Sequence, residues 1–416
     1  MKKIFITLTI VLAILALSFL GWRIFTRDQD TSVGEVVRNV LPFGTGEGLN
    51  IPTNFEDPVM LNEADFLDED GSPTSNLFML SSVPVSGMAV FEREGETIVR
   101  YIERATGHIH DAVLPEDIGE DRLTKIRVTN TTIPKIYEAV FRPDGGALLL
   151  RSLSEETDFV ENRALTLTPP TTQSTSTENL YNISSVNISN SISSVSLLVN
   201  NLIYFSSRDG VFSTQAFNGT GLRTILTSPF RDWRVSTAGT NTLIHNKASS
   251  ISTGYAYTLN TTNGALTRVA GPHTGLIAIP SPVGNRVLYS YTEGGVTKLV
   301  SRNVQANSTY EITPATLAEK CIWSTRSVGT IFCGAPSQGV GFSEPDNWYS
   351  GNSVFLDRIW MHDTVNEVAR VLIEPIRVVG LDIDLYQPML SPSENYLVFI
   401  NKIDLSLWAL KLEDSL

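Results

Sequence analysis

The stretch LIAIPSPVGNRVLYSY, residues 276–291, places Gly284 in a short turn between two apolar runs of the kind that form β-strands. Gly239 and Gly329 stand 45 residues before and after Gly284, each in a similar turn between apolar runs. Self-similarity at this period is typical of a β-propeller, in which one repeat forms one four-stranded blade. The sequence therefore predicts an all-β fold built from sheets around an axis.

Runs of alternating apolar residues, bounded by Gly, Pro, Asn and Asp, divide residues 76–416 into seven expected blades. The six that hold four strands each begin at Val85, Ile136, Ser193, Asp232, Leu276 and Lys320. The seventh holds only three strands, at 386–390, 396–401 and 405–412. We expect residues 76–81 to supply its missing outer strand by pairing with 405–412, because this pairing closes the ring and removes an exposed edge.

A turn-and-strand pattern recurs in LSPSENYLVFI (390–400), PSPVGNRVLY (280–289) and FRPDGGALL (141–149). This pattern resembles the repeat unit of TolB-like, WD-repeat-like β-propellers, and the resemblance covers about residues 76–412. It implies a propeller fold and leaves the activity open, because that superfamily includes protein-binding scaffolds, sugar binders and accessory domains of peptidases. With its apolar N-terminal segment, the chain is similar to uncharacterised membrane-anchored bacterial propeller proteins.

The N-terminal segment has the length and composition of a membrane anchor. Residues 4–22 carry no charge, follow Lys2 and Lys3, and are long enough to span the hydrocarbon layer as a helix. No small-residue cleavage site of the A-x-A type follows, which favours an uncleaved anchor over residues 1–27 rather than a cleaved signal peptide. The two lysines favour a cytoplasmic N-terminus and therefore an extracytoplasmic propeller. Residues 28–75 show no sustained periodicity and are expected to form a linker or strap.

The charge of the chain bears on its partners. Beyond residue 27 the chain carries 27 basic and 44 acidic residues, a net charge of −17. Such a surface repels nucleic acid and anionic lipid headgroups, so we expect no nucleic-acid partner.

The only two cysteines, Cys321 and Cys333, flank an expected turn centred on Ser327. They should face each other across a hairpin, close enough for a disulfide. A disulfide would indicate an oxidising compartment, and the alternative is a pair of reduced, buried thiols.

The sequence contains no recognisable catalytic motif, and we expect no cofactor. There is no G-x-S-x-G, no G-x-x-x-x-G-K-[ST] and no H-E-x-x-H. His108 and His110 alternate on one strand beside Asp111 and could share a metal, but an exposed polar strand face is the simpler interpretation. We therefore expect neither catalytic residues nor a metal site.

One loop, at 335–353, holds the candidate binding residues. These are Phe342, Glu344, Asp346, Trp348 and Tyr349. Aromatic side chains rimmed by acidic groups suit contact with a protein or a carbohydrate. The alternative is a loop that folds back as a plug over the central channel and buries Trp348.

These observations predict a non-catalytic, membrane-anchored extracytoplasmic scaffold that binds another protein of the cell envelope. Two alternatives stay open at this point. One is a propeller that binds surface polysaccharide through the same face, and the other is a hydrolase with paired carboxylates in the central channel.

Overall fold

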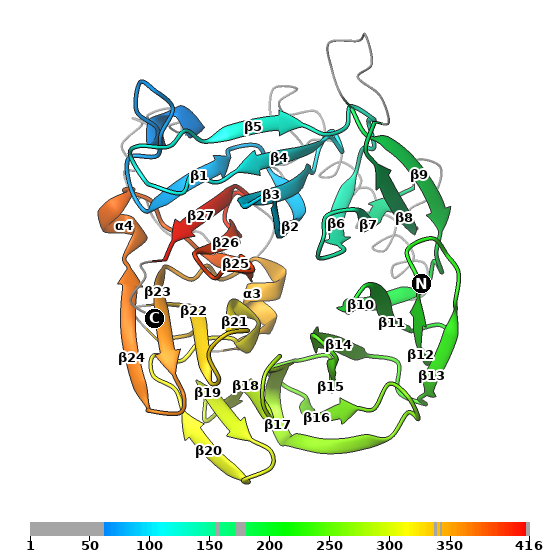
Figure 1. Ribbon diagram of the computed structural model, residues 1–416. Helices are drawn as coiled ribbons and strands as arrows, with labels where there is room; N and C mark the ends of the chain where they lie inside the picture. Colours follow the sequence, from blue (N-terminus) through cyan, green and yellow to red (C-terminus); the bar gives the residue numbers. More distant parts are fainter. Residues whose placement is uncertain (1–61, 155–158, 171–179, 337–338, 342, 413–416) are drawn as a thin grey trace, which may run out of the picture. The chain divides into compact units, whose positions relative to one another are not determined.

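The computed structural model describes residues 62–154, 159–170, 180–336, 339–341 and 343–412 (Figure 1). Within these ranges no helix is long and apolar enough to cross a membrane. The expected anchor, residues 4–22, lies outside the described residues. Most described residues lie in β-strands, and the helical elements are the short η1, η2, α3 and α4.

Three sheets of four antiparallel strands each come first in the ring. The first comprises β2 (Val85–Arg93), β3 (Glu96–Glu103), β4 (Ile109–Val113) and β5 (Thr124–Arg127). The second comprises β6 (Ile136–Phe141), β7 (Ala147–Leu153), β8 (Val160–Thr168) and β9 (Asn182–Asn187). The third comprises β10 (Ile192–Leu198), β11 (Asn201–Ser206), β12 (Val211–Gln215) and β13 (Arg223–Thr227). All twelve strands were expected from the sequence to within a few residues.

The next sheet has seven strands, in the order β14 to β20. They are β14 (Trp233–Ala238), β15 (Asn241–Asn246), β16 (Thr253–Leu259), β17 (Leu266–Pro280), β18 (Arg286–Glu293), β19 (Val296–Asn303) and β20 (Ser308–Glu311). The expectation that a separate strand begins at Leu276 is wrong, because β17 already begins at Leu266. The backbone there keeps pairing, first with β16 at Ala270 and His273 and then with β18 at Thr274. As a result, β17 is shared by two four-stranded units.

Two further sheets complete the ring. One comprises β21 (Cys321–Trp323), β22 (Thr330–Pro336), β23 (Asp357–Asp363) and β24 (Val368–Ile373). The other comprises β25 (Leu385–Leu390), β26 (Tyr396–Asn401), β27 (Leu407–Lys411) and β1 (Leu77–Ser81). Three short helical elements accompany these strands: η2 (Ala318–Lys320) precedes β21, α3 (Asp346–Ser350) lies between β22 and β23, and α4 (Pro375–Val378) lies between β24 and β25.

The predicted closure of the ring by an N-terminal strand is confirmed. β1 pairs with β27 in antiparallel register, with Leu77 opposite Leu410 and Met79 opposite Trp408. All five residues of β1 are buried, so this outer strand covers the edge of β27 and also belongs to the core. Figure 1 shows β1, from near the beginning of the described chain, beside β27 from its end.

The sheets radiate from a central axis, which makes the fold a β-propeller. The first strand of one sheet contacts the first strand of a neighbour, as in β2 with β6, β10 with β14 and β2 with β25. Figure 1 shows these inner strands around a central opening. A cavity of about 470 Å³ at this opening is lined by residues of β2, β6, β10, β14 and β25.

The glycine repeat that predicted the fold marks one turn in successive units. Gly239, Gly284 and Gly329 each follow the innermost strand of a unit, and each has a φ angle between +60° and +84°. Glycine adopts this left-handed conformation without steric cost. The repeat in the sequence therefore reflects a backbone requirement of the turn.

The predicted disulfide is present in the structure. Cys321 and Cys333 lie directly opposite each other on β21 and β22, with their Cα atoms 4.1 Å apart, and their sulfur atoms are bonded. Both side chains are buried in a cluster with Trp323 and Trp348. The disulfide thus joins the first two strands of this sheet inside its core.

Residues 62–75, the end of the expected strap, pack against the ring. The 3-10 helix η1 (Glu63–Phe66) buries Phe66 against Trp408, with the ring centroids 5.0 Å apart. Glu63 forms an ion pair with Lys125 at 2.5 Å and accepts a hydrogen bond from the backbone N–H of Ser82 at 2.8 Å. This part of the chain is therefore anchored to β5 and β1.

Candidate functional site

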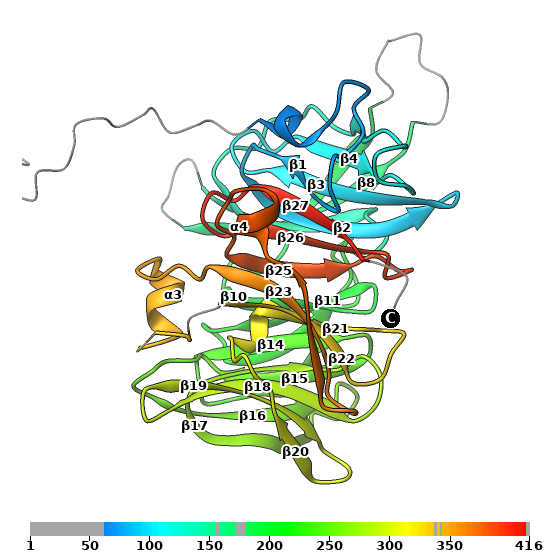
Figure 2. The ribbon, with the colours of Figure 1, turned by 90° about the vertical axis from the view of Figure 1, so that its left-hand side faces the viewer.

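The helix α3 lies in the loop that joins β22 to β23. Figure 2 shows α3 projecting on the left, away from the C-terminal end of the described chain. Trp348, the central residue of α3, is only 1% exposed. Its ring packs near the rings of Phe355 and Tyr386, at centroid distances of 6.1 and 6.0 Å. The helix therefore turns its tryptophan inward.

Hydrogen bonds tie residues 343–350, which we call the α3 segment, to three other parts of the ring. The Asp346 carboxylate accepts from the backbone N–H of Ser250 at 2.6 Å. The hydroxyl of Thr292, on β18, donates to the carbonyl of Glu344 at 3.1 Å. The ammonium of Lys402, in the turn after β26, donates to the carbonyl of Trp348 at 2.7 Å. The α3 segment thus crosses from one sheet to its neighbours.

A buried lysine lies beneath the α3 segment between two carboxylates. The Lys320 side chain is 0% exposed, and its Nζ lies 2.8 Å from Asp357 Oδ2 and also contacts Asp384 Oδ1. It donates in addition to the carbonyl of Leu385 at 3.1 Å. The cation lies 4.8 Å from the ring centre of Phe355, which adds a cation–π contact.

This cluster has one carboxylate more than Lys320 can neutralise. Burial raises the pKa of Asp357 to about 7, against the opposing effect of Lys320 and with a further increase from Asp384. Asp357 Oδ2 accepts the N–H of Leu385 at 2.8 Å, whereas Oδ1 has no hydrogen-bond partner in the described part of the chain. Near neutral pH Asp357 is therefore only partly ionised.

A pocket of about 470 Å³ opens beside this cluster, between the β22–β23 loop and the connection from β24 to β25. Three apolar side chains that line it are each between 51% and 54% exposed, and they belong to Val354, Leu356 and Ile376. We call these three residues the apolar patch. Single exposed apolar residues are common, but several together mark an interaction surface.

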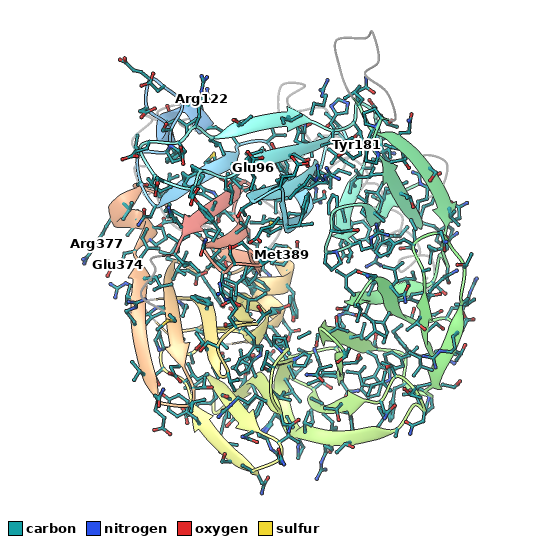
Figure 3. The ribbon with its side chains drawn as sticks, viewed as in Figure 1. Glu96, Arg122, Tyr181, Glu374, Arg377 and Met389 are labelled. Atoms are coloured by element: carbon teal, nitrogen blue, oxygen red, sulfur yellow. A yellow bond between two sulfur atoms is a disulfide. The ribbon has the colours of Figure 1, made fainter. Side chains whose placement is uncertain are left out.

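The rim of the pocket is charged, and three of its charged side chains form ion pairs. Glu374 forms ion pairs with Arg358 at 3.3 Å and with Arg377 at 2.7 Å. Figure 3 labels Glu374 and Arg377 at the outer edge of the ring, beside α4. An apolar surface with a polar rim is the usual organisation of a protein interface.

The five candidate residues of the loop have different surroundings. Phe342 lies outside the described residues. Glu344 is buried and accepts the N–H of Trp348 at 2.9 Å. Asp346 accepts a hydrogen bond from the Ser249 hydroxyl at 3.1 Å in addition to the one from Ser250 described above. Tyr349 as a whole is 43% exposed, but its hydroxyl forms a hydrogen bond with Glu319. Desolvation of this hydroxyl, together with the effect of Glu319, raises the pKa of Tyr349. The burial of Trp348 agrees with the second interpretation of the loop in this one respect.

The apolar patch is hard to recognise in the sequence because Val354 and Leu356 begin a run that is typical of a strand. The pattern of residues 354–361 indicates one continuous strand, but β23 begins at Asp357. The N–H of Phe355 donates to Asp384 Oδ2 at 3.2 Å and the N–H of Asp357 donates to the carbonyl of Ile383. The buried carboxylate of Asp384 therefore draws this segment out of the sheet and leaves Val354 and Leu356 at the surface.

The described residues that line the central cavity do not include the paired carboxylates that the hydrolase alternative requires. Glu138 is the one carboxylate among the described residues that line it, and it pairs with Arg151 at 2.5 Å. Met88 and Met389 lie in the same wall, and Figure 3 labels Met389 at the central opening. A pair of facing carboxylates, which glycoside hydrolysis needs, is not formed by these lining residues.

His110 on β4 and His108, just before β4, both lie near the carboxylate of Glu103. His110 Nε2 is 3.2 Å from Glu103 Oε1, and His108 Nδ1 is 3.9 Å from Glu103 Oε2. His108 Nδ1 also lies 3.0 Å from an Arg127 nitrogen. Asp111 points elsewhere, since it binds Arg100 through both oxygens at 2.6 Å. Among the described residues no group of three or more suitable side chains could hold a metal ion.

No protein-family model matches the sequence, and no curated protein is significantly similar to it. The structure is similar to TolB from Acinetobacter baumannii, at 12% identity over 82% of this chain and 66% of that chain, with a TM-score of 0.38. It is also similar to the β-propeller domain of the trilobed protease from Pyrococcus furiosus, at 10% identity over 81% of this chain and 97% of that domain, with a TM-score of 0.44. A further match is YCF48 bound to a D1 peptide, at 10% identity over 86% and 100% of the chains, with a TM-score of 0.47. These likenesses concern the fold alone.

Proposed function

We propose that this chain is a non-catalytic, membrane-anchored scaffold whose propeller lies outside the cytoplasm and binds another protein of the cell envelope. The ring has seven blades if β17 is counted as the outer strand of one blade and the inner strand of the next. Residues 4–22 are the anchor in this proposal. The disulfide between Cys321 and Cys333 supports an extracytoplasmic location, because such bonds persist in oxidising compartments.

The observation that carries the proposal is the apolar patch around the 470 Å³ pocket. The protein behind the patch is well packed, because Phe355 and Asp357 are both buried. These two residues alternate in sequence with Val354 and Leu356 of the patch. Binding energy at protein interfaces comes mainly from a few anchor side chains that enter preformed pockets. A partner that inserts apolar side chains into this pocket would gain affinity at little cost in ordering this surface.

Site-specific crosslinking in native membranes tests the proposal. A photoreactive amino acid replaces Leu356 or Ile376 in the full chain, and Ile126 serves as the matched control. Ile126 is 53% exposed, as are the patch residues, but it lies on β5, the outer strand of a different sheet. We expect positions 356 and 376 to give the same protein adduct and position 126 to give none.

A second measurement distinguishes binding at this site from non-specific crosslinking. Leu356→Asp should abolish the adduct formed from position 376, whereas Ile126→Asp should leave it unchanged, because only the first change places a charge in the pocket. Equal crosslinking from all three positions, or no adduct from 356 and 376, would refute the proposal.

A further inference from the structure

A second cleft lies on the face of the ring opposite α3, where the turns between first and second strands and between third and fourth strands emerge. Its volume is about 710 Å³. Six threonines, three asparagines and one glutamine contribute to its wall. Arg286 is the single charged residue among those that line it, and no carboxylate does. We call it the threonine cleft; such a wall is unusual in a chain of net charge −13.

A cleft at the equivalent place between two other sheets shows that this composition is specific. It lies between the sheet closed by β1 and the sheet that begins with β2, and its volume is about 620 Å³. Its wall carries five acidic residues, which are Glu92, Glu96, Glu116, Asp117 and Asp121. The geometry of the ring therefore produces such gaps in general, and the threonine cleft differs from its counterpart in chemistry.

The polar side chains of the two clefts also differ in whether they have hydrogen-bond or ion-pair partners within the protein. In the acidic cleft, Glu92 accepts the N–H of Ser393 at 2.9 Å, and Asp117 lies 3.7 Å from the ammonium of Lys411. In the threonine cleft, Thr242 is only 4% exposed, and its hydroxyl has no hydrogen-bond partner in the ranges that the structure describes. Buried hydroxyl groups are nearly always hydrogen-bonded, so a ligand in the cleft that reached this hydroxyl would supply the partner it lacks.

Other side chains of the threonine cleft are already held in place. The amide of Asn241 donates to the carbonyl of Ser281 at 2.7 Å, and the amide of Asn285 donates to Gln305 at 2.9 Å. These bonds run between neighbouring turns and fix the orientation of the amide groups. A ligand would therefore meet an ordered set of polar groups rather than flexible side chains.

The chemistry of the wall identifies the class of ligand. Hydroxyl and amide side chains both donate and accept hydrogen bonds, as sugar hydroxyl groups do. The apolar side chains of Leu259 and Val287 also line the cleft and can cover the C–H face of a sugar ring. A single arginine is too little for a phosphate-rich ligand, and without carboxylates the wall does not favour a cation. We propose that the threonine cleft binds a neutral carbohydrate.

Ligand-observed NMR on the full chain tests this site. The protein is kept in a zwitterionic detergent, because sugar-based detergents would compete, and the probes are the neutral trisaccharides maltotriose, cellotriose and tri-N-acetylchitotriose. We expect saturation transfer to at least one of these trisaccharides. Thr242→Val, which removes the hydroxyl and keeps the shape, should weaken its binding about tenfold.

Thr297→Val is the matched control. Thr297 is also 4% exposed and its hydroxyl also lacks a partner within the described ranges, but it does not line the threonine cleft. This variant should bind the trisaccharide as the wild type does. Absence of transfer to all three probes would overturn the proposal, and so would equal affinities of the two variants. Leu356→Asp, on the opposite face, should leave sugar binding intact, so failure here is distinguishable from failure of the proposed protein-binding site.

Discussion

The indole nitrogen of Trp348 donates to the carboxylate of Asp384, with Nε1 2.9 Å from Oδ2 and 3.1 Å from Oδ1. Trp348 belongs to the loop between β22 and β23, whereas Asp384 stands directly before β25 in the next sheet. The same carboxylate also contacts the buried ammonium of Lys320. This single side chain therefore joins α3, η2 and the sheet that closes the ring.

Trp348→Phe should destabilise the fold by about 1–3 kcal/mol more than an ordinary Trp→Phe change, because it leaves part of a buried carboxylate without its donor. Trp323→Phe is the matched control, since Trp323 is 4% exposed and its indole nitrogen has no partner in the described part of the chain. The measurement is chemical denaturation of both variants. Equal losses of unfolding free energy would show that the bond to Asp384 contributes nothing.

Asp357 should make the protein less stable as pH rises towards neutral. Burial raises its pKa from the ordinary value of 3.8 to about 7, so the folded state holds a proton that the unfolded state has released. The stabilisation from this proton is complete below about pH 4 and is lost as pH rises to about 7, with a total on the order of a few kcal/mol.

Asp357→Asn tests this dependence because it keeps an acceptor for the N–H of Leu385 and cannot ionise. Relative to the wild type, the variant should gain stability between pH 5 and pH 8 in denaturant titrations. If the difference in unfolding free energy between the two proteins stays constant over that range, Asp357 does not titrate as the structure indicates.

The fold could be predicted from the sequence because its signals are local. A glycine such as Gly284 between two apolar runs specifies a hairpin, and hairpins repeated at one period specify a propeller. The closing pair β1–β27 is a long-range contact, yet it followed from a count, since the last unit lacked one strand. The continuous β17 could not be predicted in this way, because Pro272 and Gly275 inside it are typical of a loop.

The site was less predictable because it depends on contacts between residues far apart in sequence. The sequence around the buried ion pairs has no local pattern that would indicate them. Lys320 and Asp384 directly precede strands, and Asp357 is the first residue of β23. Trp348 in a loop is compatible with either an exposed anchor or a buried plug. Only the position of Asp384 beneath it, which the ring imposes, decides between the two.

His362 should make the protein sensitive to acid. It is 1% exposed, both of its ring nitrogens lack partners in the described ranges, and burial lowers its pKa to about 4. The unfolded state therefore takes up a proton near pH 6.5, before the folded state does. The stability that depends on neutral His362 is complete above pH 6.5 and is lost as pH falls to about 4, by about 3 kcal/mol.

His362→Phe should reduce the drop in melting temperature between pH 7 and pH 4.5. His245, whose pKa burial also lowers to about 4, remains in this variant and keeps part of the acid sensitivity. The double variant His245→Phe with His362→Phe should therefore show a still smaller drop. A pH profile identical to that of the wild type in both variants would refute the role of these histidines.

The disulfide should stabilise the fold by about 3 kcal/mol, because it closes a short loop in the unfolded chain. The two cysteines are 12 residues apart, and Cys333 is 0% exposed. Replacing both cysteines by alanine should lower the unfolding free energy by that amount. Alkylation of the denatured protein without reductant should add no mass, and a mass increase would show free thiols.

Val199 occupies a backbone conformation that suits glycine. It begins the two-residue turn between β10 and β11 with a φ of +57°, where a β-branched side chain is strained. Gly239 stands at the corresponding place between β14 and β15 with a φ of +60°. Val199→Gly should therefore raise the unfolding free energy by about 1 kcal/mol, despite the greater freedom that glycine has in the unfolded chain.

Gly239→Val is the reciprocal change and should lower stability by a similar amount. A Cβ atom at Gly239 would meet no other atom within 4 Å, so the cost arises from the backbone and not from a clash. Both variants are compared with the wild type by thermal unfolding at one pH. Opposite shifts of the melting temperature would tie the turn preference to φ, whereas a destabilised Val199→Gly would mean that contacts of Val199 at the central cavity outweigh its backbone strain.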